Sequence, residues 1–137
     1  MLEEAGLPRR DELIMSGEYS FDSGSERTAT LLKLGDTPSA IFACNDEIAA
    51  GALFAARIKN VAVPQQLSII GFEDSPFSRQ SWPKLTTAHQ PNSEIAAGAA
   101  RVLTENIRSA RQGKKTDKPT VLEFKPELVV RDSTCPA

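Results

Sequence analysis

Histidine, cysteine and long apolar runs are scarce in this chain, and each scarcity argues against a class of protein. The 137 residues include one histidine and two cysteines, Cys44 and Cys135. Two cysteines without further histidines or cysteines nearby do not make a zinc site. One cysteine lies in an apolar strand and the other in the final tail, which is an unpromising disulfide pair. We therefore expect reduced thiols, as in a cytoplasmic protein.

A strong charge of one sign is missing as well. The formal net charge is −2, so electrostatics give no reason to expect that this segment itself binds nucleic acid or a membrane. No apolar run approaches the roughly 20 residues that a membrane-spanning helix needs. The first residues also lack the basic-then-apolar pattern of a secretory signal. The composition, 40% hydrophobic and 25% charged, is typical of one soluble domain or one lobe of a larger protein.

Motifs of catalysis are absent too. The sequence contains no phosphate-binding glycine loop, no dinucleotide-binding fingerprint, no hydrolase nucleophile elbow and no zinc-protease helix motif. His89 is better interpreted as a partly exposed strand residue than as a general base. Glu73 and Asp74 are adjacent, so a strand would point them to opposite faces, which is poor geometry for an acid/base pair. We expect no catalytic residue, no cofactor and no metal site.

The apolar pattern predicts alternating strands and helices. Strands are expected at residues 39–44, 67–72 and 86–90, and helices at 25–34, 46–59 and 92–112, the last two capped by Asn45 and Asn92. Residues 16–24 and 74–85 are predicted to be irregular, and two final strands are predicted at 120–124 and 127–130. The alternation indicates an α/β fold with a largely parallel sheet.

Polar side chains follow the first two predicted strands. Asn45 comes after the first strand and Glu73 after the second. Ligands bind at the carboxyl ends of strands in open α/β sheets, so these positions predict half of a small-molecule cleft. Tyr19, with polar neighbours, offers an aromatic face that suits a ring-shaped polar ligand. Plainer alternatives exist, because Asn45 also suits a helix cap, Glu73 a solvated turn and Tyr19 the core.

Four stretches carry a resemblance to a known family: TPSAIFACNDEIAAGAL, VPQQLSIIGFEDSP, PKLTTAHQPNSEIAAGAARVL and ELVVRDST, in this order along the chain. They resemble the effector-binding domain of lactose-repressor-type (LacI/GalR) bacterial transcription regulators over nearly the whole chain. The resemblance implies a type I periplasmic-binding-protein-like fold with two α/β lobes joined by crossover strands. This chain would be mostly the Rossmann-like, three-layer C-terminal lobe, and the helix at 92–112 would pack with the other lobe.

The resemblance also implies roles for single residues. Asn45 matches an effector-contacting residue, and Tyr19 matches an aromatic residue that stacks on the effector. Phe72 is expected to pack beside the site. Glu73 stands where the family usually has an aspartate that hydrogen-bonds the ligand. The additional methylene is expected to alter the sugar that is accepted.

Dimerisation is a further expectation from the resemblance. Family members dimerise through the helix that contains Ala50 and Leu53 and through the loop from Phe77 to Trp82. They begin with a helix-turn-helix domain, a hinge helix and a first lobe, none of which this sequence shows. The resemblance thus implies that residues 1–137 are a partial, N-terminally truncated effector-binding and dimerisation domain. Operator DNA would be bound only through the absent DNA-binding domain.

The leading hypothesis is therefore a cytoplasmic, non-enzymatic transcription regulator that responds to a small-molecule effector such as a sugar. The family resemblance implies that this regulator is a repressor. It would act as a homodimer or higher oligomer without binding a membrane. One alternative is a periplasmic sugar-binding protein of a transporter. Another is a small α/β enzyme such as a sugar-modifying hydrolase.

Overall fold

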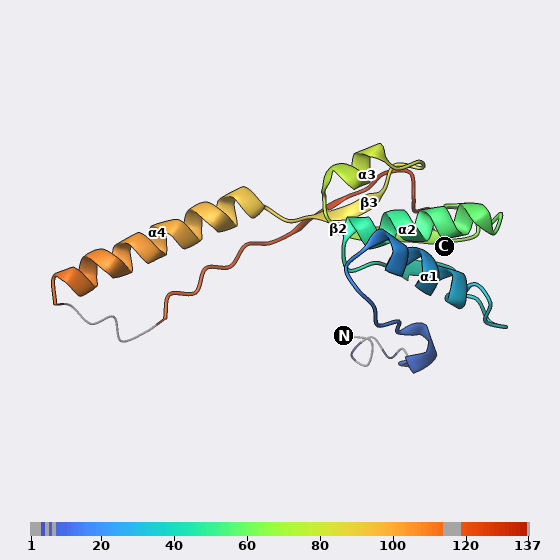
Figure 1. Ribbon diagram of the computed structural model, residues 1–137, viewed down its shortest axis with the longest axis horizontal. Helices are drawn as coiled ribbons and strands as arrows, with labels where there is room; N and C mark the ends of the chain where they lie inside the picture. Colours follow the sequence, from blue (N-terminus) through green and yellow to red (C-terminus); the bar gives the residue numbers. More distant parts are fainter. Residues whose placement is uncertain (1–3, 5, 7, 114–118, 137) are drawn as a thin grey trace.

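The computed structural model describes residues 4, 6, 8–113 and 119–136. Its elements are a short 3-10 helix η1 (Asp11–Leu13), α1 (Phe21–Leu31), β1 (Ala40–Phe42), α2 (Asp46–Ile58), β2 (Ser68–Glu73), α3 (Pro76–Gln80), β3 (Thr86–His89), α4 (Asn92–Arg111) and β4 (Glu127–Val129). Figure 1 shows a body that contains the sheet with α1, α2 and α3, and a long arm formed by α4 and the chain that returns beside it.

The sheet has the order β1-β2-β3-β4. β1 pairs with β2 and β2 with β3 in parallel, whereas β4 joins β3 antiparallel. The predicted α/β fold with a largely parallel sheet is confirmed. Because β1, β2 and β3 run in the same direction, the chain segments that follow them lie at one end of the sheet, called here the carboxyl edge.

The core lies between one face of the sheet and α2. Ile69 and Leu85 on the sheet side are fully buried, and they pack with a helix face made of Ala49, Ala52 and Ala56. Small alanine side chains let the helix axis approach the sheet closely, so the apolar surface is removed from water without a large residue. This packing fixes the N-terminus of α2 at the carboxyl edge.

The helix α1 begins at Phe21, earlier than the predicted start at residue 25. The predicted irregular segment is confirmed for residues 16–20 and is wrong for residues 21–24. The Ser20 hydroxyl caps the helix by accepting a hydrogen bond from the backbone N–H of Ser23. Gly24 belongs to the helix because a Cβ there would lie 2.2 Å from the carbonyl oxygen of Ile48 in α2. A glycine that signalled a loop instead permits close packing of two helices.

Three further expectations are corrected. Residues 74–85 were expected to be irregular, but they contain α3, which has a proline in its first turn. Residues 120–124 form no strand; Leu122 and Phe124 instead approach Gly98 of α4. Asn92 is the first residue of α4, with Pro91 at the cap position and no side-chain cap.

Candidate functional site

Asn45 caps α2 at the carboxyl edge. Its side-chain oxygen Oδ1 accepts a 2.8 Å hydrogen bond from the backbone N–H of Ile48, which confirms the predicted helix cap. The amide –NH2 of the same side chain makes no hydrogen bond with the described residues, and it therefore keeps two donor positions for a bound molecule. Capping and ligand contact are compatible at this residue.

Glu73 ends β2 with a left-handed backbone conformation, φ 99°, and Asp74 follows with φ 55°. Positive φ is uncommon for residues with a side chain and is concentrated at binding and active sites. Desolvation raises the pKa of Glu73, and the nearby carboxylates of Asp46 and Glu47 raise it further. A hydroxyl or N–H donor from a ligand would relieve this unfavourable environment.

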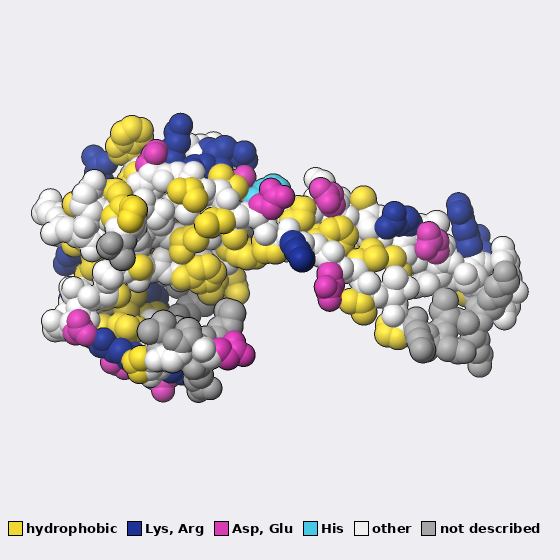
Figure 2. All heavy atoms as spheres, turned by 180° about the vertical axis from the view of Figure 1, so that it is seen from behind, with side chains coloured by type: hydrophobic (Ala, Val, Ile, Leu, Met, Phe, Trp, Pro, Cys, Tyr) yellow, Lys and Arg dark blue, Asp and Glu magenta, His cyan; other side chains and the backbone are white. Residues whose placement is uncertain are grey.

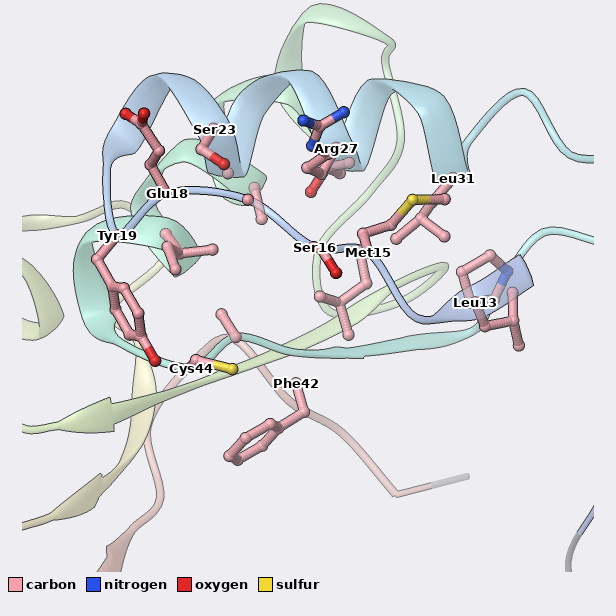
Figure 3. Close-up of a pocket in the computed structure, with 18 of the residues that line it drawn as sticks. Leu13, Met15, Ser16, Glu18, Tyr19, Ser23, Arg27, Leu31, Phe42 and Cys44 are labelled. Atoms are coloured by element: carbon pink, nitrogen blue, oxygen red, sulfur yellow. The ribbon is translucent and has the colours of Figure 1, made fainter. Parts of the chain in front are cut away.

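Tyr19 lies beside the same edge. Its side chain is 72% exposed, so the alternative of a core aromatic is not what the structure shows. Phe21 donates its backbone N–H to Oε1 of Glu47 at 3.3 Å, which ties the start of α1 to the first turn of α2. Figure 3 shows the tyrosine ring reaching toward Cys44, the residue directly before Asn45.

The structure brings three of the predicted ligand residues to one edge but does not enclose them together. Tyr19 borders a cavity of about 480 Å³ between α1 and β1. Glu73 borders a second cavity, of about 430 Å³, together with Asp74 and His89. Phe72 is half-buried within β2. The arrangement is therefore an open, polar edge bordered by two separate cavities.

Sequence reasoning missed Asp46 as a buried anchor of this edge. Its side chain is fully buried and accepts 2.6 Å hydrogen bonds from the backbone N–H of Ser75 and from the hydroxyl of Thr87. A Cβ at Gly71 would lie 2.2 Å from the Asp46 carboxylate, so the glycine leaves room for it. These contacts join the chain after β2 and the middle of β3 to α2, and they hold Glu73 in place.

The sequence also did not predict a second network of hydrogen bonds, which is centred on Asp74. Its carboxylate accepts hydrogen bonds of 2.7 Å from Arg131 and 2.8 Å from the Ser78 hydroxyl. Although desolvation raises the pKa of Asp74, the hydrogen bonds from Arg131 and Ser78 outweigh it, and the pKa is lowered overall. Nδ1 of His89 lies 3.4 Å from Oδ2 of Asp74 without a hydrogen bond among the described residues.

The residues expected at a dimer interface have different exposures. Trp82 is 78% exposed and Phe77 is 43% exposed. Ala50 is half-buried, whereas Leu53 belongs to the buried core. Leu53 nevertheless borders a small cavity with Arg57 and Trp82, so α2 and the loop after α3 form one continuous surface.

The described part of the chain contains neither a disulfide nor a candidate metal site. Both cysteines are free, and no group of histidine, cysteine or acidic residues there is arranged to hold a metal ion. His89 lies in β3 with an intermediate exposure, which confirms its interpretation as a partly exposed strand residue. None of the described helices has the length and apolar character needed to cross a membrane.

Comparison with known proteins identifies the family. A family model described as a periplasmic binding protein-like domain matches residues 1–134. The HTH-type transcriptional repressor PurR of Actinobacillus pleuropneumoniae is 41% identical to this chain over 96% of its length. The HTH-type transcriptional regulator DegA of Bacillus subtilis is 41% identical over 98% of the chain.

Solved structures agree with these relatives. A solved structure of a LacI-family transcriptional regulator from Sanguibacter keddieii superposes on 96% of this chain, with a TM-score of 0.86 and 35% sequence identity. The regulator CelR in complex with cellobiose superposes with a TM-score of 0.85 at 28% identity, also over 96% of this chain.

The chain therefore belongs to the periplasmic-binding-protein-like domain family. Within that family it is a member of the LacI group. The relatives named above are transcription regulators. It spans 38% of the length of the PurR and DegA relatives, and 39% and 48% of the CelR and Sanguibacter chains.

Proposed function

We propose that this chain is an effector-binding part of a cytoplasmic transcription regulator, with a sugar or related small molecule as the effector. The observation that carries the proposal is the carboxyl edge itself. The free amide donors of Asn45, the exposed ring of Tyr19 and the desolvated carboxylate of Glu73 lie around one end of a parallel sheet. Hydrogen-bonding groups beside an aromatic face suit a polyhydroxylated ring.

Relatives support the class of ligand. CelR is described in complex with cellobiose, and a LacI-family regulator from Lactobacillus casei, 25% identical to this chain, is described with bound sucrose. Effector binding would favour one arrangement of the effector domain over another and so change the affinity for operator DNA through a separate DNA-binding domain. Residues 1–137, with a net charge of −2, would not contact DNA themselves.

The alternatives have less support. The PurR and DegA relatives are named as HTH-type transcription regulators, which favours a regulator over a transporter's binding protein. An enzyme would need an acid/base pair or nucleophile, and Asp46 and Asp74 are already held by hydrogen bonds within the chain. We therefore infer a binding domain without catalytic activity. A sugar-hydrolysing activity abolished by Glu73→Gln would reverse this inference.

Isothermal titration of this chain with cellobiose, sucrose and glucose tests the proposal. We expect saturable binding of at least one sugar, reduced at least tenfold by Tyr19→Ala and by Asn45→Ala. Because loss of the cap costs about 1 kcal/mol of stability, Asn45→Ser is the matched control: it keeps a capping oxygen and removes the amide donors, so it should also weaken binding while the melting temperature is maintained. Binding that is unchanged in all three variants would rule out this edge as the site.

A further inference from the structure

The turn after β2 contains two residues in a strained backbone conformation. Glu73 and Asp74 have φ values of 99° and 55°, and neither is a glycine. A conformation of this kind costs free energy, so it persists only where neighbouring groups compensate for that cost. The groups that hold this turn are therefore candidates for a role in placing the Glu73 side chain.

The two backbone N–H groups that follow Glu73 are held by one buried pair of side chains. The N–H of Ser75 donates to Oδ2 of Asp46 at 2.6 Å. The N–H of Asp74 donates to Oγ1 of Thr87 at 3.4 Å, and the same hydroxyl donates to Oδ1 of Asp46 at 2.6 Å. Successive N–H groups of a turn can form a concave site for an anion, called a nest. Here the buried carboxylate occupies that nest from within the chain.

Asp46 and Thr87 are both fully buried. Asp46 also lies in the first turn of α2, where the helix dipole stabilises a negative charge. Hydrogen bonds to a charged group are stronger than those between neutral groups, and the loss of one partner leaves a buried acceptor unsatisfied. The nest therefore resists rearrangement more than a solvent-exposed turn would.

The same carboxylate connects the two polar ligand candidates of the carboxyl edge. Asn45 directly precedes Asp46 and caps α2. Glu73 directly precedes the two N–H groups of the nest. Its pKa is raised by desolvation and then by the charges of Asp46 and Glu47, which agrees with a carboxylate kept beside this network. The placement of Glu73 relative to Asn45 thus depends on contacts made by Asp46.

We propose that Asp46 and Thr87 are positioning residues for effector binding. Neither touches the effector, because both side chains are buried; they fix the Glu73 carboxylate relative to the Asn45 amide before a ligand arrives. Polar groups that are preorganised in this way lose less freedom on binding, and a fixed arrangement discriminates between ligands. The inference deepens the proposed function, and its consequences for binding rest on that function.

Two variants at position 87 separate the hydroxyl from the shape of the side chain. Thr87→Val keeps the shape and removes the hydroxyl, whereas Thr87→Ser keeps the hydroxyl and removes a methyl group. NMR of the ligand-free chain measures φ through one-bond Cα–Hα couplings and backbone chemical shifts. We expect positive φ at Glu73 and Asp74 in the wild type and in Thr87→Ser, and loss of positive φ at Glu73 in Thr87→Val.

Ser133→Ala is the matched control for the loss of buried hydrogen bonds. The Ser133 hydroxyl is also fully buried. It accepts from the backbone N–H of Thr86 and donates to the carbonyl oxygen of Ile69, so its contacts lie in the strands and not in the turn after β2. Ser133→Ala should lower the melting temperature as Thr87→Val does, but both φ values should stay positive. If Thr87→Val does not fold, Asp46→Asn, which keeps the side-chain shape and removes the charge, is measured in the same way.

The consequence for binding is measured by isothermal titration with cellobiose, sucrose and glucose. A double-mutant cycle compares Glu73→Gln in the wild-type and Thr87→Val backgrounds. In the wild type we expect Glu73→Gln to weaken binding about tenfold, the usual effect of losing a hydrogen bond to a charged group. In the Thr87→Val background, where binding is already weaker, its additional effect should fall below about threefold, because the two residues act together. Thr87→Ser and Ser133→Ala should bind nearly as the wild type does.

Two results would overturn the proposal. Positive φ at Glu73 in a folded Thr87→Val chain would mean that the nest does not hold the turn. An equally large effect of Glu73→Gln in both backgrounds would mean that Thr87 has a structural role alone. A wild-type chain that binds none of the three sugars would contradict the proposed function instead, and the φ values of the ligand-free variants would then decide on the positioning.

Discussion

The carboxylates at the carboxyl edge differ in whether they accept hydrogen bonds from within the chain. Asp46 and Asp74 accept hydrogen bonds from within the chain, whereas Glu73 makes none with the described residues, and its pKa is raised by desolvation and by Asp46 and Glu47. A carboxylate that is desolvated but unpaired is poised to accept hydrogen bonds from a ligand. Glu73 is thus the acidic residue at this edge that suits ligand binding.

Asp74 is expected to contribute to stability as a charged residue. Asn tolerates the left-handed backbone at φ 55°, so Asp74→Asn removes the charge with little backbone cost. We expect a loss of about 2 kcal/mol in the free energy of unfolding at neutral pH, the typical value of a hydrogen bond to a charged group. Urea denaturation measures it.

The pH dependence of this loss has a defined sign. The pKa of Asp74 is lowered in the folded chain despite desolvation, through its hydrogen bonds to Arg131 and Ser78. Its stabilising contribution is therefore complete above the unfolded pKa of about 3.9 and disappears as the pH falls through the lower folded pKa. The difference between wild type and Asp74→Asn should shrink below about pH 4. The exposed Asp132→Asn is the control, and a loss that is independent of pH would contradict the assignment.

At the scale of elements, α1 and α2 are held together by a close crossing through two glycines. A Cβ at Gly51 would lie 2.0 Å from the carbonyl oxygen of Phe21, and one at Gly24 would lie 2.2 Å from that of Ile48. Backbone atoms cannot move aside as a flexible side chain can, so a methyl group at Gly24 or Gly51 would force the two helices apart. This crossing positions Ser20 and Tyr19 next to the first turn of α2.

Gly51→Ala should therefore destabilise the chain although alanine is the better helix former. Overpacking of a well-packed contact costs about 1–3 kcal/mol, more than the roughly 1 kcal/mol gained in helix propensity. The melting temperature should fall. Gly35→Ala is the control, since a Cβ at that position would meet nothing within 4 Å, and its effect should stay within about 0.5 kcal/mol. A stabilised Gly51→Ala chain would show that the helices separate easily.

At the scale of the whole molecule, apolar side chains are exposed on the body and along the arm, as Figure 2 shows. Trp82 is the most exposed of the large hydrophobic residues, at 78%, and Ile58 and Phe54 of α2 are 62% and 48% exposed. Exposed aromatic residues of this kind are enriched in protein–protein interfaces. Such exposure is what the dimer surface expected on α2 and on the loop after α3 would require.

We expect the chain to self-associate at micromolar concentration through this surface. Trp82→Arg should weaken the association at least tenfold, because buried tryptophan often contributes more than 2 kcal/mol to an interface. Sedimentation velocity measures the change. Val121→Arg, at a position on the arm that is 76% exposed, is the control for added charge. A wild-type chain that stays monomeric at tens of micromolar would contradict the dimer surface.

The alternation of strands and helices was predictable because it depends on local pattern. Asn45 caps α2 as its residue type predicts, and the parallel strands follow apolar runs. Of the candidate site, the sequence identified the polar ends of β1 and β2. It did not identify Asp46 and Arg131 as partners of residues far along the chain, because no local pattern encodes a contact between distant segments.

The sequence by itself determined that three parallel strands alternate with helices and which polar residues end these strands, since propensity, capping and apolar period act within a few residues. It did not determine the start of α1 or the presence of α3. Only the tertiary structure decided that Gly24 lies inside a helix and that residues 120–124 pack on α4 instead of forming a strand. The physical reason is that helix crossings and strand pairing are contacts between distant segments, whose free energy depends on which neighbours the fold supplies.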